Sequence, residues 1–72
     1  MNLEEFIAAF KEELEIDAAI TPETEFMALE DWSSLSMMEL IVLMNESFDK
    51  TYKVSDIRNC STIADLFALA SA

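Results

Sequence analysis

Apolar residues recur every three or four positions in separate stretches of this chain, and that spacing constrains its fold more than any other feature. The first stretch holds Leu3, Phe6, Ile7, Phe10 and Leu14, and the last holds Ile63, Leu66, Phe67 and Ala70. Such spacing places apolar side chains along one face of an α-helix. We therefore expect an all-α fold, a small antiparallel bundle of three main helices plus one short helix, with a long first loop.

Capping residues indicate where the helices begin. Asn2 with Glu5 three positions later is typical of a capping box, which predicts a helix from Leu3 to about Glu15. Thr62 is a suitable N-cap for the last helix. Two further elements are expected, a helix over Ser34–Phe48 and one short turn of helix over Ser55–Arg58.

The segment between the first two helices has no regular period. It runs from Ile16 to Ser33, and Thr21-Pro22 within it indicates a turn or the start of a short helical turn. A loop of this length needs anchors in the core. The expected anchors are Phe26, Leu29 and Trp32.

The length of 72 residues allows one domain, residues 1–72, whose core supplies only about 3–5 kcal/mol of stability. A single cysteine, Cys60, can form no internal disulfide and suits a reducing compartment. We expect Cys60 to act as a small buried hydrophobic residue. The alternative is a free redox-active thiol.

The charge of the chain excludes several classes of partner. Fifteen acidic and 4 basic residues give a net charge of −11, which repels nucleic acids and anionic membranes and attracts proteins with basic patches. The longest apolar run, Leu40 to Met44, is far shorter than the roughly 20 residues that cross a bilayer. Because the acidic start also lacks the basic residues of a signal peptide, we expect a cytoplasmic protein, and the charge favours a monomer.

Missing residue types argue against an enzyme. The chain has no histidine and no glycine. Serine and cysteine nucleophiles activated by histidine, histidine-ligated zinc, glycine-rich phosphate loops and EF-hand calcium loops are therefore all excluded. The acidic pairs Glu4/Glu5 and Glu12/Glu13 point in different directions on a helix and are expected on a solvated face. We expect no catalytic residues and no metal site.

The predicted middle helix has two apolar faces. One carries Met37, Leu40, Ile41, Met44 and Phe48, and this face is expected to lie in the core. The opposite face carries Leu35, Met38 and Val42 beside two carboxylates, Glu39 and Glu46. A bundle of this size cannot bury both faces, so the second face is expected to be a docking surface for partners. The alternative is that Leu35 or Met38 packs under the long loop.

A serine opens this helix, and taken alone Ser34 would be interpreted as its N-cap. However, the stretch DWSSLSMMEL, Asp31 to Leu40, resembles the acyl and peptidyl carrier protein family. That family's signature is Asp-Ser-Leu, three variable residues and Glu-Leu, with Glu-x-Phe-Asp or similar further on. The matching positions here are Ser34-Leu35, Glu39-Leu40 and Glu46 to Asp49, and the resemblance extends over essentially the whole chain.

The resemblance implies that Ser34 is the attachment residue for a 4′-phosphopantetheine arm, whose thiol carries an acyl group as a thioester. A helix N-terminus favours a phosphate at that position. A separate phosphopantetheinyl transferase would attach the arm, and acyl-loading and acyl-processing enzymes would use it. By the same resemblance the partner-recognition residues are Leu35, Met38, Glu39, Val42 and Glu46, and Cys60 lines the acyl pocket.

One position departs from the family pattern, because Ser33 stands where the family usually has aspartate before the attachment serine. Ser33 and Ser36 are also rival hydroxyls, although the spacing to Leu35, Glu39 and Leu40 favours Ser34. The sequence thus indicates a carrier of acyl intermediates in fatty acid, polyketide or related biosynthesis. Two alternatives remain open, an unmodified carrier-like acidic interaction module and a binder of small molecules or lipids without covalent attachment.

Overall fold

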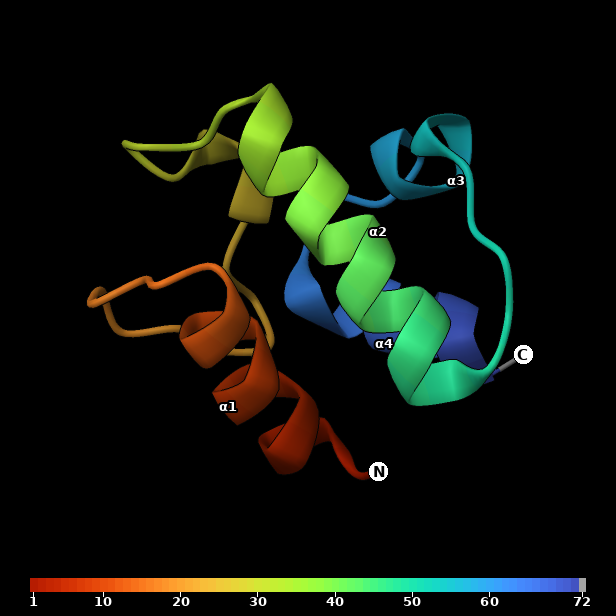
Figure 1. The fold of residues 1–72 in the computed structure, drawn as a ribbon. Helices are drawn as coiled ribbons and strands as arrows, with labels where there is room; N and C mark the ends of the chain where they lie inside the picture. Colours follow the sequence, from red (N-terminus) through yellow and green to blue (C-terminus); the bar gives the residue numbers. More distant parts are fainter. Residues whose placement is uncertain (72) are drawn as a thin grey trace.

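Four α-helices and one turn of 3₁₀-helix make up the fold in the computed structural model, which describes residues 1–71 (Figure 1). The elements are α1 (Leu3–Glu13), η1 (Phe26–Ala28), α2 (Ser34–Phe48), α3 (Val54–Arg58) and α4 (Ile63–Ser71). The described part of the chain has no strand. The predicted all-α class, with three main helices, one short helix and a long first loop, is confirmed.

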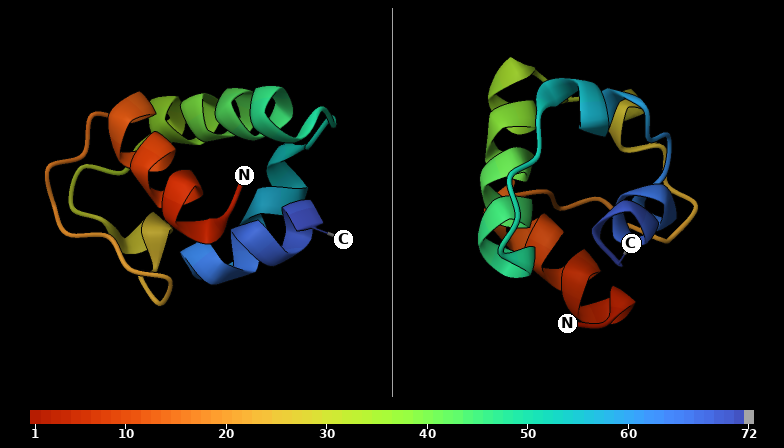
Figure 2. Two further views of the ribbon diagram at one scale, coloured as in Figure 1. Left: turned by 90° about the horizontal axis from the view of Figure 1, so that it is seen from below. Right: turned by 90° about the vertical axis from the view of Figure 1, so that its right-hand side faces the viewer.

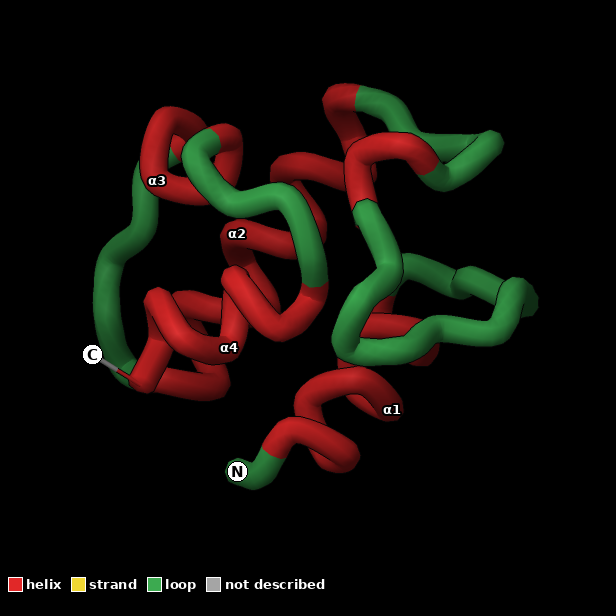
Figure 3. Tube along the Cα trace, turned by 180° about the vertical axis from the view of Figure 1, so that it is seen from behind, coloured by secondary structure: helices red, strands yellow, loops and turns green. Residues whose placement is uncertain are grey.

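The helices enclose one core. Helices α1 and α2 run in opposite directions, and α4 lies beneath them in the same sense as α2 (Figure 2). The long connection from α1 to α2 forms one side of the molecule, as the tube in Figure 3 shows. The largest fully buried side chains are Phe6, Phe10, Phe26, Leu40, Met44, Ile57, Ile63 and Leu66.

Helix α1 starts as predicted and ends earlier. The Asn2 Oδ1 atom accepts the Glu5 N–H at 2.8 Å, and Glu5 Oε1 accepts the Asn2 N–H at 2.9 Å, which completes the predicted capping box. The helix ends at Glu13 rather than Glu15, because Glu15 adopts a left-handed conformation with a φ of 53°. That conformation turns the chain so that Ile16 N–H donates to the carbonyl of Lys11 at 2.9 Å.

All three predicted loop anchors lie in or against the core. Phe26 is fully buried, and Leu29 and Trp32 are half-buried. The Trp32 ring centroid lies 6.5 Å from that of Phe10 and 5.5 Å from that of Phe26. Aromatic pairs at such distances add stability beyond their buried area. Trp32 thus fixes the end of the loop that leads into α2.

The loop is also tied to the start of α4 by backbone hydrogen bonds. Ile63 N–H donates to the Thr24 carbonyl at 3.1 Å, and Ala64 N–H donates to the Pro22 carbonyl at 2.9 Å. These bonds satisfy N–H groups at the start of a helix, which otherwise lack partners. Local sequence patterns could not predict these hydrogen bonds, because the bonds join residues that lie far apart in the chain.

The two faces of α2 have the predicted character. Met37, Leu40 and Met44 are buried, while Ile41 and Phe48 are half-buried against the core. Leu43, which the sequence left unassigned, is also buried. The helix ends at Phe48, and its C-cap, Asp49, has a left-handed conformation with a φ of 52°.

The two C-terminal helices begin close to their predicted positions. Helix α3 starts at Val54, one residue earlier than expected, with Asp56 Oδ2 accepting the Lys53 N–H at 2.9 Å. In α4 the predicted cap is present, since Thr62 Oγ1 accepts the Asp65 N–H at 3.2 Å. Asp65 Oδ2 in turn accepts the N–H groups of Ser61 and Thr62 at 2.9 and 3.0 Å.

Candidate functional site

The N-cap of α2 is Ser33, which corrects the interpretation of Ser34 as the capping residue. Ser33 Oγ accepts the Ser36 N–H at 3.4 Å, and Ser36 Oγ accepts the Ser33 N–H at 3.3 Å, so the two serines cap the helix reciprocally. Ser34 is the first helical residue, and its side chain is exposed. Among the described residues nothing hydrogen-bonds to its hydroxyl, so this oxygen is open to modification.

The backbone around Ser34 favours an anion. The Met37 N–H donates to the Ser33 carbonyl at 3.1 Å, and the Ser36 N–H is held by the cap. The N–H groups of Ser34 and Leu35 have no partner within residues 1–71. Unpaired N–H groups and the positive end of the helix dipole attract a phosphate at this position. The first turn of α2 also carries no acidic residue that would repel a phosphate.

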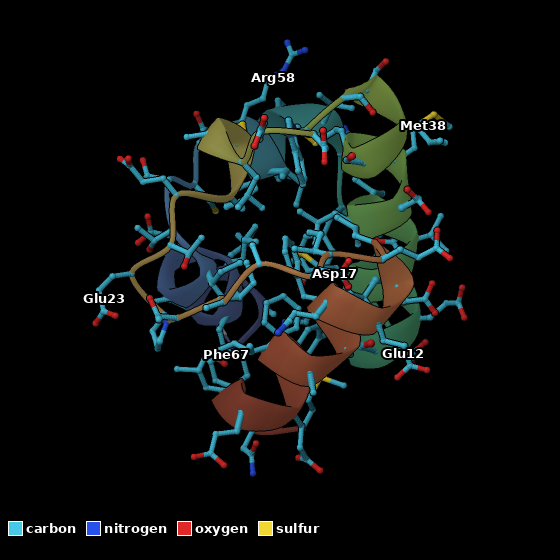
Figure 4. The ribbon with its side chains drawn as sticks, turned by 90° about the vertical axis from the view of Figure 1, so that its left-hand side faces the viewer. Glu12, Asp17, Glu23, Met38, Arg58 and Phe67 are labelled. Atoms are coloured by element: carbon cyan, nitrogen blue, oxygen red, sulfur yellow. The ribbon has the colours of Figure 1, made fainter. Side chains whose placement is uncertain are left out.

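A groove of about 460 Å³ opens beside Ser34, between the start of α2 and α3. Its lining residues are Met27, Trp32, Ser33, Ser34, Met37, Met38, Val54 and Arg58. Arg58 is the one charged residue among these, and the others are apolar or small and neutral. Met38 and Arg58 lie at the same end of the molecule, from α2 and α3 respectively (Figure 4). The sequence analysis did not find this groove, because residues from three separate segments form it.

The predicted apolar strip on α2 lies on the surface. Leu35, Met38 and Val42 are 67%, 63% and 52% exposed. Neither Leu35 nor Met38 is therefore covered by the long loop, and that alternative is wrong. Glu46 is exposed and Glu39 is half-buried, and no ion pair with another described residue engages either carboxylate. The strip and its two carboxylates are thus open to a partner.

Cys60 is buried, as predicted, and its thiol is unsuited to redox chemistry. Its Sγ donates to the Asp56 carbonyl at 3.6 Å. Burial raises the pKa of the Cys60 thiol, and the nearby carboxylates of Asp65 and Asp56 raise it further. Because the thiolate is the reactive form, Cys60 acts as a small buried hydrophobic residue.

Tyr52 is a buried residue whose hydroxyl has no hydrogen-bond partner in residues 1–71. Its N–H donates to Asn45 Oδ1 at 2.8 Å, which fixes the backbone where the chain leaves α2. Burial raises the pKa of the Tyr52 hydroxyl, and the Asp56 carboxylate adds to that shift. The hydroxyl is therefore neutral at physiological pH.

A second, smaller cavity, with a volume of about 210 Å³, lies between the end of α1, the loop before α2 and Ser36 in the first turn of α2. Leu14, Ile16, Leu29 and Trp32 contribute apolar walls, and Glu15, Asp17, Glu30 and Asp31 contribute carboxylates. Within residues 1–71, no group of three or more acidic or cysteine side chains could hold a metal ion. No helix in the described part of the chain has the length and apolarity to cross a membrane.

Comparison with known proteins identifies the family. The family model described as "Phosphopantetheine attachment site" matches residues 4–70. No curated protein and no solved structure matches the chain significantly. The family match covers nearly the whole chain, and it agrees with an open serine hydroxyl at a helix N-terminus. The chain therefore belongs to the phosphopantetheine-attachment family of carrier proteins, which hold a covalent 4′-phosphopantetheine group and are not themselves catalysts.

Proposed function

We propose that this chain is an acyl carrier protein whose arm is attached to Ser34. One observation carries the assignment of the residue. Of the three serines at the start of α2, Ser33 and Ser36 bind each other in the cap, whereas the Ser34 hydroxyl is exposed and without a partner in residues 1–71. The unpaired N–H groups beside it support a phosphate at the same place.

Attachment requires a transferase and coenzyme A. The Ser34 oxygen forms a bond to the phosphorus that bears the pantetheine, the bond from that phosphorus to the neighbouring phosphate breaks, and adenosine 3′,5′-bisphosphate leaves. The hydroxyl proton passes to a base on the transferase, since the chain has no histidine to accept it. The terminal thiol of the arm then carries the acyl group as a thioester.

The partner surface in this proposal is the exposed strip Leu35, Met38 and Val42, framed by Glu39 and Glu46. The strip supplies apolar contact, and the carboxylates meet basic patches on the transferase and on acyl-loading and acyl-processing enzymes. A net charge of −11 steers such partners into rapid encounter. Fast, weak docking suits a protein that must visit several enzymes in sequence.

The cargo in this proposal is an acyl intermediate of fatty acid, polyketide or related biosynthesis. The groove beside Ser34 is lined mainly by apolar or small neutral side chains, with Arg58 as its one charged residue, and this mainly uncharged lining supports an acyl cargo. The single free and buried cysteine suits the reducing cytoplasm.

The attachment site is tested with a promiscuous phosphopantetheinyl transferase and coenzyme A, followed by intact-protein mass spectrometry. We expect the wild-type chain to gain one phosphopantetheine and Ser34→Ala to gain none. Ser33→Ala and Ser36→Ala are matched controls that keep the Ser34 hydroxyl and are expected to be modified. Modification of Ser34→Ala at either neighbouring serine would show that the assignment is wrong.

A further inference from the structure

We propose that the Met38 thioether is a site of reversible oxidation, and that an oxygen atom on its sulfur weakens partner docking while the fold is kept. The oxidant is hydrogen peroxide. This inference rests on the proposed function, in which the exposed strip Leu35, Met38 and Val42 is the partner surface. It adds a modification site on that surface, separate from the attachment residue Ser34.

The methionines of α2 differ sharply in exposure. Met38 is 63% exposed, and its side chain projects outward from α2 in Figure 4. Its neighbour Met37 is buried, and Met44 is fully buried. Because the oxidant has to reach the sulfur atom, peroxide reacts with Met38 before it reacts with either of these two. The fold thus protects the methionines on which the core depends.

The other sulfur atoms lie outside the strip. Cys60 is buried, and its thiol has a raised pKa, so the reactive thiolate is scarce. Met1 is exposed, but the N-terminus lies at the other end of the molecule from the start of α2 (Figure 1). Met27 is 36% exposed and belongs to η1. Met38 is therefore the residue at which oxidation changes the partner surface itself.

The position of Met38 makes an added oxygen costly for docking. Leu35, Met38 and Val42 are spaced three and four residues apart, which places Met38 between the other two on one helix face. A sulfoxide oxygen there puts a strong hydrogen-bond acceptor at the centre of an apolar strip. Burying such a group against an apolar partner surface, without a donor, costs free energy that the thioether does not.

The chemistry of the step balances with peroxide alone. A lone pair on Met38 Sδ attacks one peroxide oxygen, and the sulfur–oxygen bond forms as the oxygen–oxygen bond breaks. The sulfur loses two electrons, and the departing oxygen keeps them and leaves as water with the proton of the transferred oxygen. A methionine sulfoxide reductase reverses the change, because a dithiol is oxidised to a disulfide and the sulfoxide oxygen leaves as water.

The experiment treats the protein with hydrogen peroxide and locates the added oxygen by peptide mass spectrometry. We expect it on Met38 before any appears on Met37 or Met44. The treated protein is then supplied to a promiscuous phosphopantetheinyl transferase with coenzyme A. We expect kcat/KM for attachment at Ser34 to fall about tenfold, equivalent to about 1.4 kcal/mol, which is less than the value of fully burying a methionine side chain.

Three further readouts identify weakened docking as the cause. The loss should lie mainly in KM for the carrier, because the Ser34 hydroxyl itself is unchanged. Circular dichroism should show the same helix content before and after treatment, because the core methionines are shielded. Methionine sulfoxide reductases acting on both epimers, with dithiothreitol, should restore the untreated kcat/KM.

Met38→Leu and Met27→Leu are matched variants, since leucine keeps an apolar side chain of similar volume without a sulfur atom. Each variant is compared with its own untreated sample. Peroxide should leave the rate of Met38→Leu at its untreated value. It should lower the rate of Met27→Leu as it lowers that of the wild type, because this variant keeps the Met38 sulfur.

An unchanged kcat/KM in wild-type protein that carries the Met38 sulfoxide would overturn this inference. A peroxide-dependent loss in Met38→Leu equal to that of the wild type, a loss in kcat alone, or a loss of helix content would overturn it as well. All these results leave the proposed function intact. Failure of the untreated wild-type protein to accept the arm on Ser34 would instead refute the proposed function.

Discussion

Among single residues, the two adjacent serines at the start of α2 differ in what they do, because Ser33 caps the helix and Ser34 leaves its side chain exposed. A serine at the start of a helix is ordinarily used as a cap, and here Ser33 fills that role together with Ser36. Ser34 therefore takes no part in the capping hydrogen bonds. Ser33 departs from the family signature, which usually has aspartate at this position. It nevertheless serves as the N-cap of α2.

The Asp65 carboxylate, which accepts hydrogen bonds at the start of α4, is expected to stabilise the fold to an extent that depends on pH. Hydrogen bonds from the Ser61 and Thr62 N–H groups lower the pKa of the Asp65 carboxyl below its ordinary value of 3.8. A lowered folded-state pKa stabilises the fold above the unfolded pKa, and this contribution disappears as pH falls through the folded-state pKa. We expect Asp65→Asn to lower the thermal midpoint at pH 7 and to converge with the wild type as pH falls below about 4.

The measurement is thermal unfolding followed by circular dichroism across that pH range. Asp17→Asn, which removes an exposed loop carboxylate, is the control and should not show this pH-dependent difference. A constant difference between Asp65→Asn and the wild type at all pH values would contradict the capping account.

Because the buried Tyr52 hydroxyl has no hydrogen-bond partner in residues 1–71, we expect phenylalanine at this position to give a more stable fold. Leaving a buried polar group unpaired costs about 1–3 kcal/mol, and Tyr52→Phe removes that group while keeping the ring. We expect the free energy of unfolding to rise by about 1 kcal/mol, measured by urea denaturation. A loss of stability would show that the hydroxyl has a partner.

At the scale of elements, the sequence predicted the helices well because their starts depend on neighbouring residues. Asn2 with Glu5, and Thr62 at the last helix, are local signals. The end of α1 was predicted too late, because Glu15 takes a left-handed conformation that sequence patterns associate with glycine. Leu43 and the groove beside Ser34 were missed, because both depend on where other elements pack.

Helix α2 has one face for stability and one for recognition, and substitutions should separate them. Changing both Glu39 and Glu46 to lysine should keep the fold and slow acyl loading at low salt, because charge reversal weakens steering. Met44→Ala should instead cost about 2–5 kcal/mol, because Met44 is fully buried. Circular dichroism beside a loading assay distinguishes the two effects. Normal loading by the double lysine variant, or its unfolding, would show that the faces are wrongly assigned.

At the scale of the whole molecule, a small core is combined with a large excess of negative charge. Glu12 and Glu23 project from opposite sides of the surface in Figure 4. A net charge of −11 on 72 residues opposes compaction by mutual repulsion. The same charge attracts basic partners, so the feature that weakens the fold also serves the proposed function.

Screening by salt should therefore stabilise the fold. Between about 0.01 M and 0.15 M ionic strength the screening length falls from roughly 30 Å to 8 Å. We expect the thermal midpoint to rise over this range when it is followed by circular dichroism. A flat or falling midpoint would show that the carboxylates are compensated within the folded chain.

The proposed phosphopantetheine arm on Ser34 can be sought in protein purified from its own host. Intact-mass measurement followed by fragmentation of the peptide around α2 locates any modification to a single residue. We expect one phosphopantetheine, on Ser34, with Ser33 and Ser36 unmodified. A chain that is wholly unmodified in its host, or that carries the arm on another residue, would contradict it, and the unmodified result would favour an acidic interaction module.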